Sequence, residues 1–118
     1  MAASDSEWFS VRCLFRAASN RPWGPHDLQV GESAYEERIT LWKAESADDA
    51  IRLAEAEART HAAEIESEYL GLAQSCRIGD LVEEGAQIFS LMRRSSLSPD
   101  DYIDRFFDTG TEYQTTSE

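Results

Sequence analysis

Residues that could hold a metal or move a proton are few, because the chain has only two histidines, His26 and His61. On a helix, the spacing of Glu57, His61 and Glu64 places the three side chains on one face. A carboxylate–imidazole–carboxylate set can bind a divalent metal. Without a fourth ligand, the same pattern is typical of a solvated acidic helix. We therefore expect no metal site.

Nucleophilic or acid–base catalysis has no stronger support. Neither Cys13 nor Cys76 has a histidine nearby in the sequence, and no Gly-x-Ser-x-Gly, CxxC or phosphate-binding glycine loop is present. Asp108-Thr109-Gly110 has the residues of the aspartic-protease motif but follows a predicted helix, where it acts as a stop. Glu36 and Glu37 are neighbours on a predicted strand and point to opposite faces. We expect no catalytic residue and no cofactor.

The strongest candidate for function is a set of aromatic and arginine side chains on three predicted strands. Tryptophan, tyrosine and arginine are enriched at the energetic centres of protein interfaces. We expect six of them on the sheet face turned away from the long helix: Trp8, Arg12, Arg38, Trp42, Tyr69 and Arg77. They would contact a second copy or another protein. Alternatively, a second helix with Tyr102, Phe106 and Phe107 covers this face within the monomer.

The strands that would position these residues follow from period-two hydrophobicity. Alternating apolar and polar residues, rich in aromatic and β-branched types, predict strands at 8–16, 35–44, 69–78 and 86–93. Residues 17–34 carry prolines and glycines and form a long connection. Such a loop is either mobile, functional or partly structured.

Two helices complete the expected fold. Ser46 followed by two aspartates resembles a capping box, and an alanine- and glutamate-rich run then extends to Ser67. Ser98-Pro99 begins a shorter helix that ends near Phe107. The order strand–strand–helix–strand–strand–helix predicts an α+β fold, with an antiparallel four-stranded sheet and the alanine-rich helix packed on one face. We expect one domain over 8–110, a flexible N-terminus at 1–7 and a frayed polar tail at 111–118.

The negative charge is concentrated in the predicted helices and tail. The net charge is −12; residues 44–69 hold eight acids and two bases, and residues 98–118 hold six acids and one base. This acidic balance argues against binding to nucleic acid or anionic membranes, which need lysine and arginine. The predicted strands are close to neutral.

The two cysteines, Cys13 and Cys76, fall on the apolar register of predicted strands, where free cysteine packs as a small hydrophobe. We therefore expect buried thiols rather than a disulfide. No basic segment followed by an apolar run opens the chain, and no stretch approaches membrane-span length. These features predict a cytoplasmic protein.

Several segments resemble a family of short bacterial proteins, widespread in actinobacteria, that is grouped as a domain of unknown function. They are Trp8-Phe9-Ser10-Val11, the run from Tyr35-Glu36-Glu37 to Ala50, Glu68-Tyr69-Leu70-Gly71, and the run from Tyr102 to Gly110. The resemblance spans residues 8–112. It implies a shared fold and a bacterial origin, and it assigns no activity.

We therefore expect a non-enzymatic protein-interaction module, either self-associating as a homodimer or binding a basic protein partner. Two alternatives remain open. One is a small enzyme or ligand binder with a pocket between the 17–34 loop and the sheet, where Arg21, His26 or a cysteine would meet carboxylates. The other is an acidic immunity-type inhibitor of a basic protein.

Overall fold

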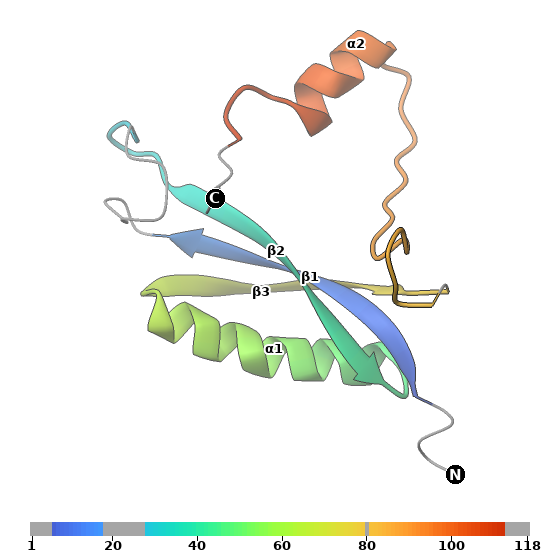
Figure 1. Ribbon diagram of the computed structural model, residues 1–118. Coiled ribbons are helices and arrows are strands. Elements are labelled where there is room, and N and C mark those ends of the chain that lie inside the picture. The colour runs from blue at the N-terminus through green and yellow to red at the C-terminus, as the bar shows by residue number, and fades with distance from the viewer. Residues whose placement is uncertain (1–5, 18–27, 80, 113–118) are drawn as a thin grey trace.

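The computed structural model describes residues 6–17, 28–79 and 81–112 (Figure 1). Its main body consists of three strands and one long helix, in the order β1 (Glu7–Ala17), β2 (Ala34–Ala44), α1 (Ala47–Glu64) and β3 (Ser67–Arg77). The chain continues to α2 (Pro99–Tyr102) and the π-helical turn η2 (Ile103–Phe107). The first three predicted strands and the long helix are confirmed. The expectations for the two chain ends lie largely outside the described residues.

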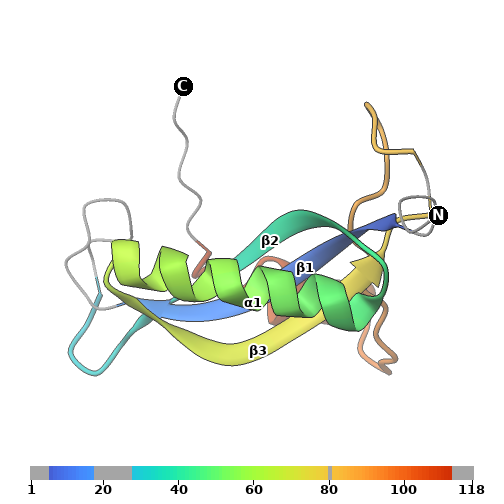
Figure 2. The ribbon, with the colours of Figure 1, turned by 90° about the horizontal axis from the view of Figure 1, so that it is seen from below.

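The three strands form one antiparallel sheet with β1 in the centre and β2 and β3 at the edges. β2 follows β1 as a neighbour, whereas β3 reaches the opposite edge of β1 after the chain has passed through α1. The helix lies across one face of the sheet, as Figures 1 and 2 show from two directions. An α+β fold with an antiparallel sheet and the alanine-rich helix on one face is therefore confirmed.

The core lies between β1 and α1. Four alternate residues of the central strand, Phe9, Val11, Cys13 and Phe15, are buried. They meet a stripe of alanines spaced every four residues along the helix, Ala50, Ala54, Ala58 and Ala62, which are also buried. Residues four apart share one side of a helix, and alanine there lets the helix approach the sheet closely. The Ser46 hydroxyl caps the helix by accepting a hydrogen bond of 3.1 Å from the Asp49 amide.

The third strand contains a bulge, and β3 pairs with β1 on both sides of it. Cys13 pairs with Ala73 and Phe15 pairs with Tyr69, so one residue of β1 lies opposite three of β3. Gly71 lies inside this bulge with φ of 78°, a conformation that residues with a side chain rarely adopt. Because the shift is an even number of residues, Tyr69 and Ala73 stay on the same side of the sheet.

The prediction of a fourth strand at 86–93 is wrong. None of these residues joins the sheet, and the segment 86–97 forms neither a helix nor a strand. Alternation identifies an extended chain with two unlike sides, but a strand also needs a neighbouring edge with which to exchange hydrogen bonds. The segment instead leaves the sheet.

The second helix forms close to its expected position, capped by the Ser98 hydroxyl, which accepts a bond of 3.2 Å from the Asp101 amide. Among the described elements it packs only against η2, and neither against a strand nor against α1. The alternative that it covers the sheet within the monomer is therefore wrong. The Cα radius of gyration is 16.6 Å, against about 13.5 Å for a compact domain of this length, because this C-terminal part stands away from the body.

Candidate functional site

The sheet has one face covered by α1 and one face that no described helix covers, and strand pairing decides which residues lie on each. Directly paired residues in an antiparallel sheet point to the same side. Arg38 pairs with the buried Cys13, and Trp42 pairs with the buried Phe9. Both therefore lie on the helix-covered side.

The third strand follows the same rule. Tyr69 pairs with Phe15, and their rings are 5.5 Å apart; Arg77 pairs with Phe9 and bonds Glu7 at the end of that same face. Of the six residues predicted to form one patch, only Trp8 and Arg12 lie on the uncovered face. The expectation that Trp8, Arg12, Arg38 and Trp42 share a sheet face is wrong.

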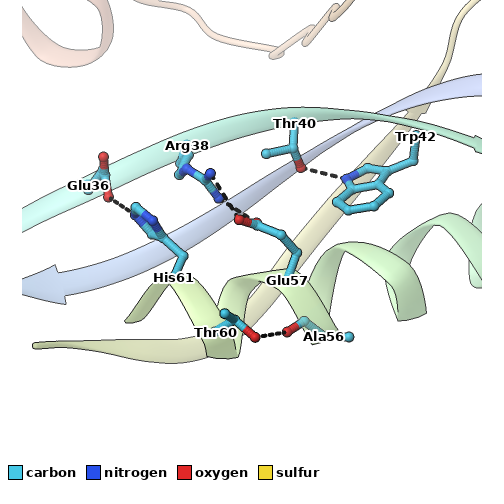
Figure 3. Close-up of polar contacts among 8 residues, drawn as sticks. All are labelled: Glu36, Arg38, Thr40, Trp42, Ala56, Glu57, Thr60 and His61. Carbon is cyan, nitrogen blue, oxygen red and sulfur yellow. Dashed lines mark hydrogen bonds and ion pairs between the residues drawn. The ribbon is translucent and has the colours of Figure 1, made fainter. Parts of the chain in front are cut away.

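The residues that lie on the covered side form polar contacts with α1 and with neighbouring strand residues. In Figure 3, the Arg38 guanidinium reaches down from β2 to Glu57 of α1, with N–O distances of 2.5 and 3.1 Å. Its neighbour Glu36 contacts His61 Nε2 at 3.3 Å. The Trp42 indole donates a bond of 2.6 Å to Thr40. Buried polar groups in proteins are almost always paired in this way.

The contact between Arg38 and Glu57 shifts the pKa of both side chains. The hydrogen bonds from Arg38 lower the pKa of Glu57, and the same bonds raise the pKa of Arg38. Since both shifts favour the charged forms, the pair is ionised in the folded protein at neutral pH. Glu57 and His61, two members of the candidate metal triad, are thus occupied by other partners. The described residues contain no group of three or more potential metal ligands.

Cys13, which is buried on the covered face, is unsuited to nucleophilic attack. Burial raises the pKa of the Cys13 thiol, and this effect outweighs the hydrogen bond with Tyr69. Burial also raises the pKa of Tyr69, whose hydroxyl donates a bond of 2.5 Å to Glu55. A reactive thiol needs a depressed pKa and an accessible sulfur. Cys13 and Cys76 are both free thiols, as expected, but only Cys13 is buried; Cys76 pairs with Ser10 on the other side of the sheet and is partly exposed.

The uncovered side, which we call the open face, consists of the alternate residues of β1 and β2 together with polar residues of β3. Its apolar part is substantially exposed: the side chains of Ile39 and Leu41 are 44% and 40% exposed, Tyr35 60% and Trp8 36%. Half-buried Leu14 lies on the same face of β1. Exposed apolar side chains grouped on one face are typical of an interaction site.

Charged side chains on the open face are mostly paired with each other. Arg16 binds Glu68 on β3, with distances of 2.6 and 3.1 Å, and Arg12 lies 3.3 Å from Glu37 on β2. Arg12 also donates to Gln74. The remaining base, Lys43, lies over the ring of Trp8 at 5.8 Å. These pairs hold the long side chains along the sheet, which leaves Ile39 and Leu41 accessible between them.

Sequence reasoning missed Tyr35, Ile39 and Leu41 because they look like the core side of β2. They are the more apolar of its two alternating sets, whereas Arg38 looks like a surface residue. The helix supplied a signal: Glu57 lies on its flank, four residues before His61, and offers acceptors for an arginine. Long side chains can bury their stems and still satisfy their heads at such a flank.

The predicted pocket beside the 17–34 loop is tested only in part. An open depression lies at that end of the sheet, between Arg16, Ser33, Glu66 and Glu68. Arg21 and His26, which were expected to line a site there, lie outside the described residues.

Comparisons of the chain with protein-family models, with curated proteins and with solved structures give no match. None of the helices in the described ranges is both long and apolar enough to cross a membrane. The function of the open face must therefore be inferred from its own residues.

Proposed function

We propose that this protein is a non-enzymatic self-association module, in which two copies of the chain bury their open faces in a homodimer. The observation that carries the proposal is the set of exposed apolar side chains on the open face: Ile39 and Leu41 on β2, Tyr35 further along β2, and Trp8 on β1. Burying such side chains is favourable by roughly 25 cal/mol for each Å² removed from water. The apolar parts of these side chains form no hydrogen bonds with water that would offset the cost of their exposure.

The charge distribution favours a second copy as the occupant. With a net charge of −12, two chains repel each other over most of their surface. The open face is the exception, because its strand residues carry three bases, Arg12, Arg16 and Lys43, and two acids, Glu37 and Glu68. A near-neutral face with both signs can be complementary to itself, as a twofold interface requires.

The proposal is tested by the mass in solution of the wild type and two matched variants. Leu41 on the open face and Leu53 on α1 are equally exposed, at 40% and 37%. Sedimentation or light scattering of the wild type at micromolar concentration should give twice the 13.3 kDa of one chain. Leu41→Asp should reduce the mass to that of one chain, because it buries an unpaired carboxylate at the interface. Leu53→Asp should leave it doubled.

A wild type that remains a single chain at 100 μM would contradict self-association. A Leu41→Asp variant that remains a dimer would show that the open face is not the contact. Circular dichroism of each variant checks that the fold is kept. Binding of a different protein to the open face of a monomeric wild type would replace this proposal with a heterologous interaction.

A further inference from the structure

The C-terminal arm, residues 81–112, carries more large apolar side chains than it can cover by itself. Three of them are mostly exposed: Met92 is 91% exposed, Phe107 78% and Leu81 77%. Others are exposed to about half that extent: Val82, Ile88, Leu91, Leu97, Ile103 and Phe106. An arm so rich in exposed apolar residues is typical of a segment that packs on another surface.

The arm is nonetheless organised by its own contacts. Arg93 lies over the Phe106 ring at 4.6 Å and donates a bond of 3.2 Å to the Tyr102 hydroxyl. The rings of Tyr102 and Phe106 are 4.9 Å apart. The extended part and the helical part of the arm are therefore held together. Their contacts still leave Phe107 and Ile103 facing outward.

The arm first contacts the open face of its own chain and then leads away from the sheet. Phe89 lies under the Arg12 guanidinium, 5.2 Å from it, and is half-buried there. Beyond this point the chain rises away from the sheet, so α2 stands on the side opposite α1 without touching a strand (Figures 1 and 2). Residues 90–97, if extended, span up to about 26 Å, which is enough to reach across a neighbouring sheet.

The open face by itself is smaller than a standard protein interface. Three strands of 11 residues, about 3.3 Å apart along the strand and about 4.8 Å between strands, cover about 500 Å². A standard interface buries about 800 Å² on each partner. The arm supplies further exposed apolar side chains, such as Met92 and Phe107. Its helical part, residues 98–108, has four acids and one base, opposite in sign to the slightly basic open face.

We infer that the two copies exchange arms: the arm of each chain packs, through Phe106 and Phe107, across the open face of the other. This inference rests on the proposed homodimer and adds the element that completes it. A twofold axis relates the two chains, so each arm packs on the open face of the other chain. Because each chain has one arm and one open face, none is left for a third chain.

Photo-crosslinking of the full-length chain tests the exchange. p-Benzoylphenylalanine replaces Phe107 in one sample and Leu53, on α1, in a control sample. Chains with ¹⁴N and with ¹⁵N are unfolded and refolded together before irradiation, and the cross-linked peptides are analysed by mass spectrometry. Exchange predicts isotopically mixed cross-links from position 107 to β1 or β2, and none of this kind from position 53.

Unmixed cross-links from position 107 in a dimeric protein would show that the arm closes on its own sheet. That result would overturn the exchange while leaving the homodimer intact. A protein that remains monomeric would overturn the proposed function itself. If no cross-link forms, the dissociation constant decides. Phe106→Ser with Phe107→Ser should weaken the dimer by at least about 30-fold, compared with little change for Leu53→Ser, and an unaltered constant refutes the exchange.

Discussion

The ion pair between Arg38 and Glu57 offers a direct test of which side of β2 faces the helix. If Arg38 lay on the open face, its removal and that of Glu57 would have independent effects on stability. In the structure the two groups are joined by two short bonds and their side chains are only 28% and 34% exposed. We therefore expect the free energies of unfolding to be coupled in a double-mutant cycle of Arg38→Gln and Glu57→Gln.

The size of the coupling follows from the partial burial. Solvent-exposed pairs contribute about 0.2–1 kcal/mol, and hydrogen bonds to charged groups contribute about 1.5–3 kcal/mol. A bidentate pair that is about two-thirds buried should lie between these ranges, and we expect a coupling of about 1–2 kcal/mol. The pair of Asp49 and Arg52 is the matched control, because it is joined at 2.9 Å but is 40% and 71% exposed. Its coupling should be about 0.3 kcal/mol.

The coupling should also depend on pH in a defined direction. Arg38 lowers the pKa of Glu57 in the folded protein, below the ordinary glutamate value of about 4.3. The stabilisation is therefore fully present above that ordinary value, and it is lost as the pH falls through the lower folded value. Between pH 5 and 7 it should not change.

Urea unfolding, followed by circular dichroism, measures the cycle. All variants must be compared at one protein concentration, because association adds to apparent stability. A coupling below 0.5 kcal/mol at pH 7, or one equal to that of the control pair, would refute the assignment of Arg38 to the helix-covered face. So would a coupling that persists undiminished at the lowest pH at which the protein stays folded.

Two further predictions concern the bulge and the core. Gly71→Ala should lower the free energy of unfolding by about 1–2 kcal/mol, because φ is 78° and a side chain is strained there, whereas Gly79→Ala should cost less; equal losses in urea unfolding would contradict the role of the bulge. Cys13 should react with a thiol reagent at pH 8 at least about tenfold more slowly than Cys76, because burial hides its sulfur and raises its pKa. Equal rates in the native protein would show that the core is open.

Much of the fold could be predicted because it depends on local patterns. The alternation in β1 identifies both its strand and its core side, since a buried face requires apolar residues at every second position. The alanines spaced four apart identify the inner side of α1 in the same way. Ser46 and Ser98 mark helix starts through their capping hydroxyls, and both caps are present.

The candidate site could not be predicted by the same means, because it depends on pairing. In β2 both alternating sets contain apolar and charged residues, so composition does not decide which set faces the helix. The choice is made by partners that are distant in sequence. Arg38 can bond to Glu57, and Tyr69 to Glu55, only when α1 lies on the same side of the sheet as these two strand residues. Ile39 and Leu41 are then turned outward.

The sequence by itself determined the periodicities of this protein: one amphipathic strand, one small-residue helix face, and the acidic charge of the helices and tail. Those features are read within a few residues, so no tertiary contact is needed to define them. Only the tertiary structure decided which side of β2 and β3 is open, and that residues 86–93 pair with no strand in the part of the chain that the structure describes. Both depend on contacts between segments far apart in sequence, where the available neighbours, rather than local preference, set the lowest free energy.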